Sequence, residues 1–143
     1  MSTTHLLYLH GFRSSPQSSK ARQMAARVQA EHPAVHWWCP QLPPSPRAAA
    51  ALIDEGTADW PAERMAVVGS SLGGYYASWL AERRGCRAVL LGFMRYTCAC
   101  APGFAARWFP LGLTLDAARL APAVVFNRQD TVHDRFLETR LGA

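Results

Sequence analysis

The stretch Val67–Tyr76, which reads VVGSSLGGYY, places two branched apolar residues before a crowded turn of glycines and serines. Within it, Gly69 to Gly73 fit the pattern G-x-S-x-G, in which the central serine stands on a tight turn between a strand and a helix. Glycine and serine are also ordinary loop residues, so the pattern needs support from the rest of the chain. The stretch predicts a buried strand, a sharp turn that carries Ser71, and a helix.

Short apolar runs along the chain predict the strands of a sheet. They lie at residues 6–9, 35–39, 65–68, 88–91 and 123–126. Continuous apolar runs of this length are typical of strands that are buried on both faces of a parallel sheet. Because segments with helical spacing separate the first four runs, we predict an α/β fold, a three-layer sandwich with a mostly parallel sheet.

Serine and proline residues predict where the first two helices begin. A serine side chain accepts hydrogen bonds from free amides at a helix start, and proline suits the first helical position. By this rule Ser14-Ser15-Pro16 would open the first helix and Ser45-Pro46 the second, which is expected over 48–55. In the third helix, apolar residues recur at helical spacing and predict a face that packs on the sheet. They are Leu72, Tyr75, Tyr76, Trp79 and Leu80. Two further helices are expected at 115–120 and 134–141.

Composition and charge favour a single domain, expected over residues 1–143. Half of the 143 residues are hydrophobic, which is enough for a sizeable core. The formal net charge is +5, but Lys20 is the only lysine and the arginines are scattered between Arg13 and Arg140. Nucleic-acid binding uses clustered cations, so we expect a solvated surface and no nucleic-acid partner.

Signals for membranes and metals are both missing from the sequence. No apolar run approaches the ~18 residues that suggest a membrane span, and no signal-peptide pattern opens the chain. We therefore expect a cytoplasmic protein without a membrane partner. The four cysteines form no C-x-x-C pair, and Cys98-x-Cys100 has no companion Cys/His pair that would complete a zinc site. The thiols are interpreted as buried or free, and neither a metal nor a cofactor is expected.

The G-x-S-x-G pattern predicts that Ser71 is a nucleophile. A nucleophilic serine needs a base, an orienting carboxylate and donors for the developing oxyanion. The Leu72 amide lies at the amino end of the third helix, where free N–H groups and the helix dipole favour negative charge, so it is the first expected donor. The second expected donor is the Phe12 amide, because His10-Gly11-Phe12 follows another strand at the same edge of the sheet. The His10 side chain is interpreted as fixing that loop rather than as catalytic.

The acid and the base should follow the serine in the order acid, then histidine. Asp130 lies just after the strand expected at 123–126 and is the predicted acid. His133 is the only histidine after Asp130. Because no further strand fits between it and the end of the chain, we interpret His133 as a surface or helix-start residue rather than as the base.

Several motifs agree in order and spacing with those of one family. They are LYLHGF at 7–12, SSP at 14–16 with SKA at 19–21, PQLPP at 40–44 and, above all, VGSSLGGYYA at 68–77. Over about residues 5–91 the sequence resembles the YqiA-like small bacterial esterases of the α/β-hydrolase superfamily. The resemblance implies that Ser71 is a nucleophile and that the substrates are short acyl esters.

The resemblance changes after Leu91, where Gly92-Phe93 stands in place of the family's Asn-Pro loop. It returns at 129–134, which is similar to the family's Gly-Asp-Glu-Val-Leu-Asp segment and places Asp130 on the family's acid. The family's catalytic histidine has no counterpart. We interpret residues 92–122 as deleted, divergent or frame-shifted and the fold as shortened at its C-terminal end. The alternative to an esterase is a non-catalytic or degraded α/β-hydrolase-like binding domain.

Overall fold

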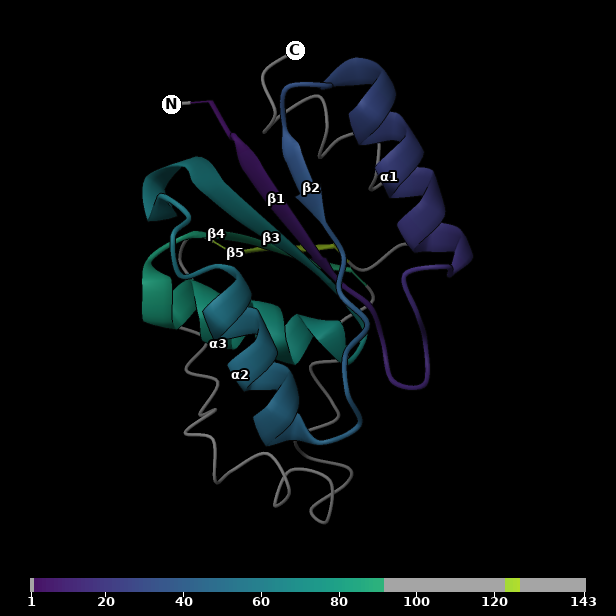
Figure 1. Cartoon of the computed structure of the whole chain (residues 1–143), viewed down its shortest axis with the longest axis vertical. Coiled ribbons are helices and arrows are strands. Elements are labelled where there is room, and N and C mark those ends of the chain that lie inside the picture. Colours follow the sequence, from purple (N-terminus) through teal and green to yellow (C-terminus); the bar gives the residue numbers. More distant parts are fainter. Residues whose placement is uncertain (1, 92–122, 127–143) are drawn as a thin grey trace.

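A computed structural model describes residues 2–91 and the backbone of 123–126, which together contain a five-stranded sheet (Figure 1). The strands are β1 (His5–Leu9), β2 (His36–Trp38), β3 (Met65–Ser70), β4 (Arg87–Leu91) and β5 (Ala123–Phe126). Their order is β2-β1-β3-β4-β5, and every neighbouring pair is parallel. The predicted parallel sheet is confirmed, and β5 has the predicted bounds.

Three α-helices connect the first four strands, with α1 at Ser19–Glu31, α2 at Pro46–Gly56 and α3 at Gly73–Arg84. A short 3₁₀ helix, η1 (Ala62–Arg64), precedes β3. The predicted start of α2 is confirmed, since Pro46 is its first residue and the Ser45 hydroxyl accepts a hydrogen bond from the Ala48 amide at 3.4 Å. The helices expected at 115–120 and 134–141 lie outside the described residues.

The predicted start of α1 was wrong by several residues. The helix begins at Ser19, and its capping residue is Ser18, whose hydroxyl accepts from the Ala21 amide at 3.4 Å. Ser15 instead forms a separate turn, in which its hydroxyl accepts from the Gln17 amide at 3.1 Å and its carbonyl from the Ser18 amide at 3.0 Å. Ser15 therefore closes a turn before the helix and does not cap it, because serine side chains stabilise turns as readily as helix starts.

The sheet separates two hydrophobic cores, because successive side chains of a strand point to opposite faces. Leu6 and Tyr8 of β1 pack in the core that also contains Met24 and Val28 of α1. Leu7 and Leu9 pack in the core on the other face. That second core takes Ile53 from α2 and Tyr75, Tyr76 and Leu80 from α3, so the aromatic face of α3 packs as predicted. Figure 1 shows α1 on one face and α2 with α3 on the other, which confirms the three-layer sandwich.

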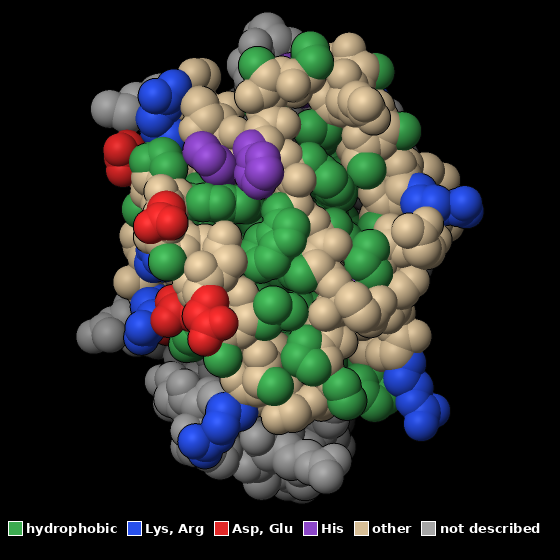
Figure 2. Space-filling view, in the orientation of Figure 1, with side chains coloured by type: hydrophobic (Ala, Val, Ile, Leu, Met, Phe, Trp, Pro, Cys, Tyr) green, Lys and Arg blue, Asp and Glu red, His purple; other side chains and the backbone are tan. Residues whose placement is uncertain are grey.

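The surface shown in Figure 2 carries charges of both signs around an apolar centre. On this face the Lys and Arg side chains are spread toward the edges and do not gather in one patch. Within the described residues, no helix is both long and apolar enough to cross a membrane.

Candidate active site

Ser71 occupies the turn between the end of β3 and the beginning of α3. Its φ is 52°, in the left-handed region that side chains with a Cβ enter only at an energetic cost. Its amide donates a hydrogen bond to the carbonyl of Leu91 at 2.9 Å, which attaches the turn to β4. Ser71 is exposed, whereas the preceding Ser70 is buried. The strained, outward-facing serine is the geometry that the G-x-S-x-G pattern predicts.

The glycines on either side of Ser71 are required by close backbone packing. A Cβ on Gly69 would lie 2.6 Å from the Cα of Gly74. A Cβ on Gly73 would lie 2.6 Å from the carbonyl carbon of Leu9 and 2.8 Å from the carbonyl oxygen of His10. Non-bonded carbon atoms prefer separations of about 3.5–4.0 Å, so neither position has room for a side chain. Gly73 thereby lets the start of α3 press against the end of β1.

The loop after β1 lies directly beside Ser71. A Cβ on Gly11 would be 3.3 Å from the Cβ of Ser71 and 3.8 Å from its Oγ. Sixty residues separate these two positions in the chain, but both follow parallel strands that are neighbours in the sheet. The carboxyl ends of such strands share one edge of the sheet. The structure therefore brings the Phe12 loop to the serine, as expected from the strand order.

Two backbone amides near Ser71 are candidates for binding an anion. Leu72 is the N-cap residue of α3, and no side chain caps this helix start. Within the described part of the chain, the N–H groups of Leu72 and Phe12 donate no hydrogen bond. Free amides at a helix start attract negative charge. Both amides therefore remain candidates for the two predicted oxyanion donors.

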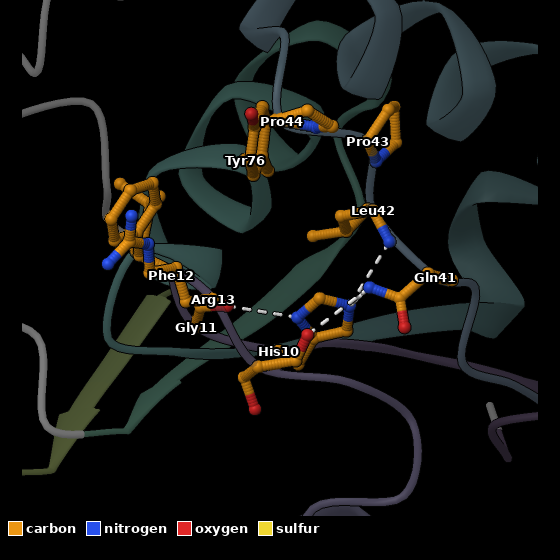
Figure 3. A pocket seen from close by; sticks show the side chains of 11 residues that line it. His10, Gly11, Phe12, Arg13, Gln41, Leu42, Pro43, Pro44 and Tyr76 are labelled. Atoms are coloured by element: carbon orange, nitrogen blue, oxygen red, sulfur yellow. Dashed lines mark hydrogen bonds between the residues drawn. The ribbon is translucent and has the colours of Figure 1, made fainter.

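His10 joins the loop after β1 to the loop after β2 (Figure 3). Its ring is buried, with 4% of its surface exposed. The Leu42 amide donates to Nε2 at 3.1 Å, and Nδ1 lies 2.9 Å from the carbonyl oxygen of Gly11. Because an amide can only donate and a carbonyl can only accept, His10 is neutral with its proton on Nδ1. Both ring nitrogens are thus occupied, which agrees with the loop-fixing role expected for His10.

A pocket of about 380 Å³ opens between these two loops and α3 (Figure 3). Its apolar lining residues are Phe12, Leu42, Pro43, Pro44, Leu72 and Tyr76. Arg13, whose guanidinium carbon lies 5.6 Å from the centre of the Phe12 ring, is the charged residue among the described lining. Burial raises the pKa of the Tyr76 hydroxyl, which therefore stays protonated. Gly11, which lies against Ser71, and Leu72, which follows it in the chain, both line the pocket, so the pocket adjoins the candidate nucleophile.

Sequence reasoning had assigned no role to the loop after β2, although Pro40–Pro44 was among the motifs of the family resemblance. This loop supplies Leu42, Pro43 and Pro44 to the pocket wall. It also donates the Leu42 amide to His10. The signal that could have found it is position, because the loop follows the carboxyl end of a predicted parallel strand.

The predicted acid, Asp130, lies outside the described residues, as do His133, Cys98 and Cys100. Burial raises the pKa of the two described thiols, Cys39 and Cys86, to about 11, so both are protonated and unreactive at neutral pH. Across residues 2–91, no group of three His, Cys, Asp or Glu side chains is arranged to hold a metal ion.

Comparison with known protein families places the described part of the chain in one of them. Residues 5–93 match the sequence model of the uncharacterised protein family UPF0227. The match covers more than half of the chain, and the chain therefore belongs to the UPF0227 family. This finding supports the resemblance to YqiA-like proteins. The matched range ends at residue 93, close to Leu91, where the resemblance was expected to change.

A second set of similar proteins shares only a short stretch with this chain. They are HTH-type transcriptional regulators ArgP. The protein from Vibrio vulnificus is 43% identical over 53 residues, which is 37% of this chain and 18% of the regulator. The protein from Aeromonas salmonicida is 43% identical over 58 residues, 41% of this chain and 19% of the regulator. The chain thus spans under a fifth of the length of these relatives.

Proposed function

We propose that this protein is a serine esterase that hydrolyses short acyl esters or thioesters through an acyl-enzyme on Ser71. The observation that carries the proposal is the left-handed φ of an exposed serine between β3 and α3. Backbone strain of this kind is costly and concentrates at functional sites. A serine that only filled a turn would gain nothing from it, and a glycine there would relieve it.

In the proposed reaction, Ser71 Oγ bonds to the acyl carbon and its proton passes to a base. The alcohol or thiol leaves with a proton, and water then cleaves the acyl-enzyme to a carboxylic acid and free Ser71. The Leu72 and Phe12 amides would bind the oxyanion of each tetrahedral intermediate. Asp130 is our proposed acid, which would orient the base.

The pocket supports a small substrate rather than a macromolecule. Its volume of about 380 Å³ lies near the lower end of the ~300–1,000 Å³ typical of small-molecule sites. An acyl chain would contact Leu42, Pro43 and Pro44, while the reacting carbonyl would lie at Ser71. This reaction uses no cofactor, and we place it in the cytoplasm. The short match to transcriptional regulators supports no proposal of a regulatory role.

A fluorophosphonate probe tests the proposal, because it bonds to activated serines and adds a defined mass. We expect the intact protein to gain one probe, and Ser71→Ala to gain none. Ser70→Ala is the matched control, since Ser70 is adjacent but buried, and it should still be labelled. Absence of labelling in folded wild-type protein would contradict the proposal.

One observation favours the second candidate, a non-catalytic α/β-hydrolase-like binding domain. His10, the histidine that lines the pocket, has both ring nitrogens in hydrogen bonds and has no free nitrogen for the serine proton. Loss of the histidine from a serine triad costs roughly 10⁶-fold in turnover. If folded protein is not labelled and does not hydrolyse p-nitrophenyl acetate above the buffer rate, the protein is better described as a binding domain. If His133→Ala removes hydrolysis, the esterase proposal stands with His133 as its base.

A further inference from the structure

We propose that His10 is a positioning residue that aims the Phe12 amide toward Ser71. This inference rests on the proposed function. The argument begins with one peptide unit, because the carbonyl of Gly11 and the N–H of Phe12 belong to the same planar group. No cis peptide bond occurs among the described residues, and in a trans peptide the C=O and the N–H point in opposite directions. Whatever holds the Gly11 oxygen therefore also sets the direction of the Phe12 N–H.

Two donors hold the Gly11 oxygen. Nδ1–H of His10 lies 2.9 Å from it, and the Ser14 amide donates to it at 3.2 Å. Gly11 needs such restraint, because glycine has the greatest backbone freedom of any residue. It cannot be replaced by a stiffer residue without disturbing the site, since a Cβ would be 3.3 Å from the Cβ of Ser71. The side chain of His10 supplies the rigidity that the glycine lacks.

The other side of the ring is anchored on the pocket wall. The Leu42 backbone amide donates to Nε2 of His10 at 3.1 Å. The side-chain nitrogen of Gln41 lies 3.4 Å from this Nε2 atom of His10. The same side-chain nitrogen of Gln41 also donates to the carbonyl of Ser14 at 3.2 Å. Because only 4% of the His10 residue is exposed, its ring is shielded from water that would compete for the hydrogen bonds of Nδ1 and Nε2. His10 thus links the loop of the pocket wall to the peptide that carries the oxyanion donor.

Two substitutions separate positioning from simple packing. In His10→Asn the short side-chain amide can still donate to the Gly11 oxygen but does not reach Leu42. In His10→Gln the longer carbonyl can still accept from the Leu42 amide but offers nothing to Gly11. Each variant loses one hydrogen bond of the same buried ring. A purely structural residue would therefore be affected similarly by both.

The first readout is the rate of fluorophosphonate labelling at Ser71, compared with the Tm of each variant. We expect His10→Asn to retain most of the wild-type rate and His10→Gln to lose about 10²-fold, the effect of removing one oxyanion donor. Both should show similar Tm values. Equal rate losses in the two variants, or losses that follow Tm, would overturn the positioning role.

The second readout does not depend on catalysis and distinguishes this inference from the proposed function. Long-range ¹H–¹⁵N NMR should show the His10 proton on Nδ1 at neutral pH. The Phe12 amide resonance should move in His10→Gln and stay close to its wild-type position in His10→Asn. If wild-type protein is not labelled but these shifts are seen, the esterase proposal fails while the His10 geometry stands. A proton on Nε2, or an unmoved Phe12 resonance in His10→Gln, would refute the inference.

Discussion

Replacing Ser71 by alanine and by glycine separates the strain of the turn from the loss of its hydroxyl. The φ of 52° places a residue with a Cβ in the left-handed region, at a cost of about 1–2 kcal/mol. Alanine retains that cost, while glycine avoids it but adds roughly 0.5–1 kcal/mol through the greater freedom of the unfolded chain. We therefore expect Ser71→Gly to be more stable than Ser71→Ala by about 0.5–1 kcal/mol, or about 2–4 °C in Tm.

Urea and thermal unfolding of the two variants measure this difference. Neither variant should react with the fluorophosphonate probe, because both lack the Ser71 hydroxyl. The two variants should therefore differ in stability but not in labelling. Ser70 provides the matched pair, because it ends β3 without a positive φ, and Ser70→Gly should be less stable than Ser70→Ala. If alanine at position 71 is as stable as glycine, the turn is not strained and the observation that carries the esterase proposal is lost.

Three further outcomes are expected. Gly73→Ala should lower the free energy of unfolding by about 3 kcal/mol or more, because the new Cβ meets backbone at 2.6 and 2.8 Å. The control is Gly85→Ala, where φ is 69° but no atom lies close to the new Cβ, and it should lower the free energy of unfolding by only about 1–2 kcal/mol. If urea unfolding shows the same loss for both variants, the backbone around Gly73 can move to accept a side chain. Gly11→Ala should fold but label about tenfold more slowly, since Ser71 must shift by a few tenths of an ångström, and an unchanged rate would refute that contact. With pKa values of about 11, Cys39 and Cys86 should react slowly with iodoacetamide at pH 8 and faster as the pH rises toward 11, because the thiolate is the nucleophile. Peptide mapping that finds fast modification at pH 8 would contradict this.

Local sequence patterns predicted the elements of the described fold well, because burial on both faces and helical periodicity are written in consecutive residues. The runs at 6–9, 65–68 and 88–91 became β1, β3 and β4 with small changes at their ends. The start of α1 was misplaced because Ser15 and Ser18 are chemically the same signal. Only the hydrogen bonds show that Ser15 closes a turn and Ser18 caps the helix.

The candidate site was predicted in part. The pattern around Ser71 indicated the strained turn, and the rule for parallel sheets indicated that the Phe12 loop would lie nearby. The pocket wall at Leu42 and the dual hydrogen bonding of His10 were not predicted in detail. Leu42 and His10 are 32 residues apart in the chain, and their contact depends on β2 pairing with β1.

By itself, the sequence determined the parallel α/β plan, the turn at Ser71 and the small residues that this turn requires. These features follow from steric limits and burial patterns within a few neighbouring residues. Only the tertiary structure decided that Gly11 lies against Ser71, that His10 holds the Gly11 peptide, and that the loop after β2 closes the pocket. The reason is that strand order brings distant segments together, and the side-chain hydrogen bonds that orient a peptide group form only once those segments are in place.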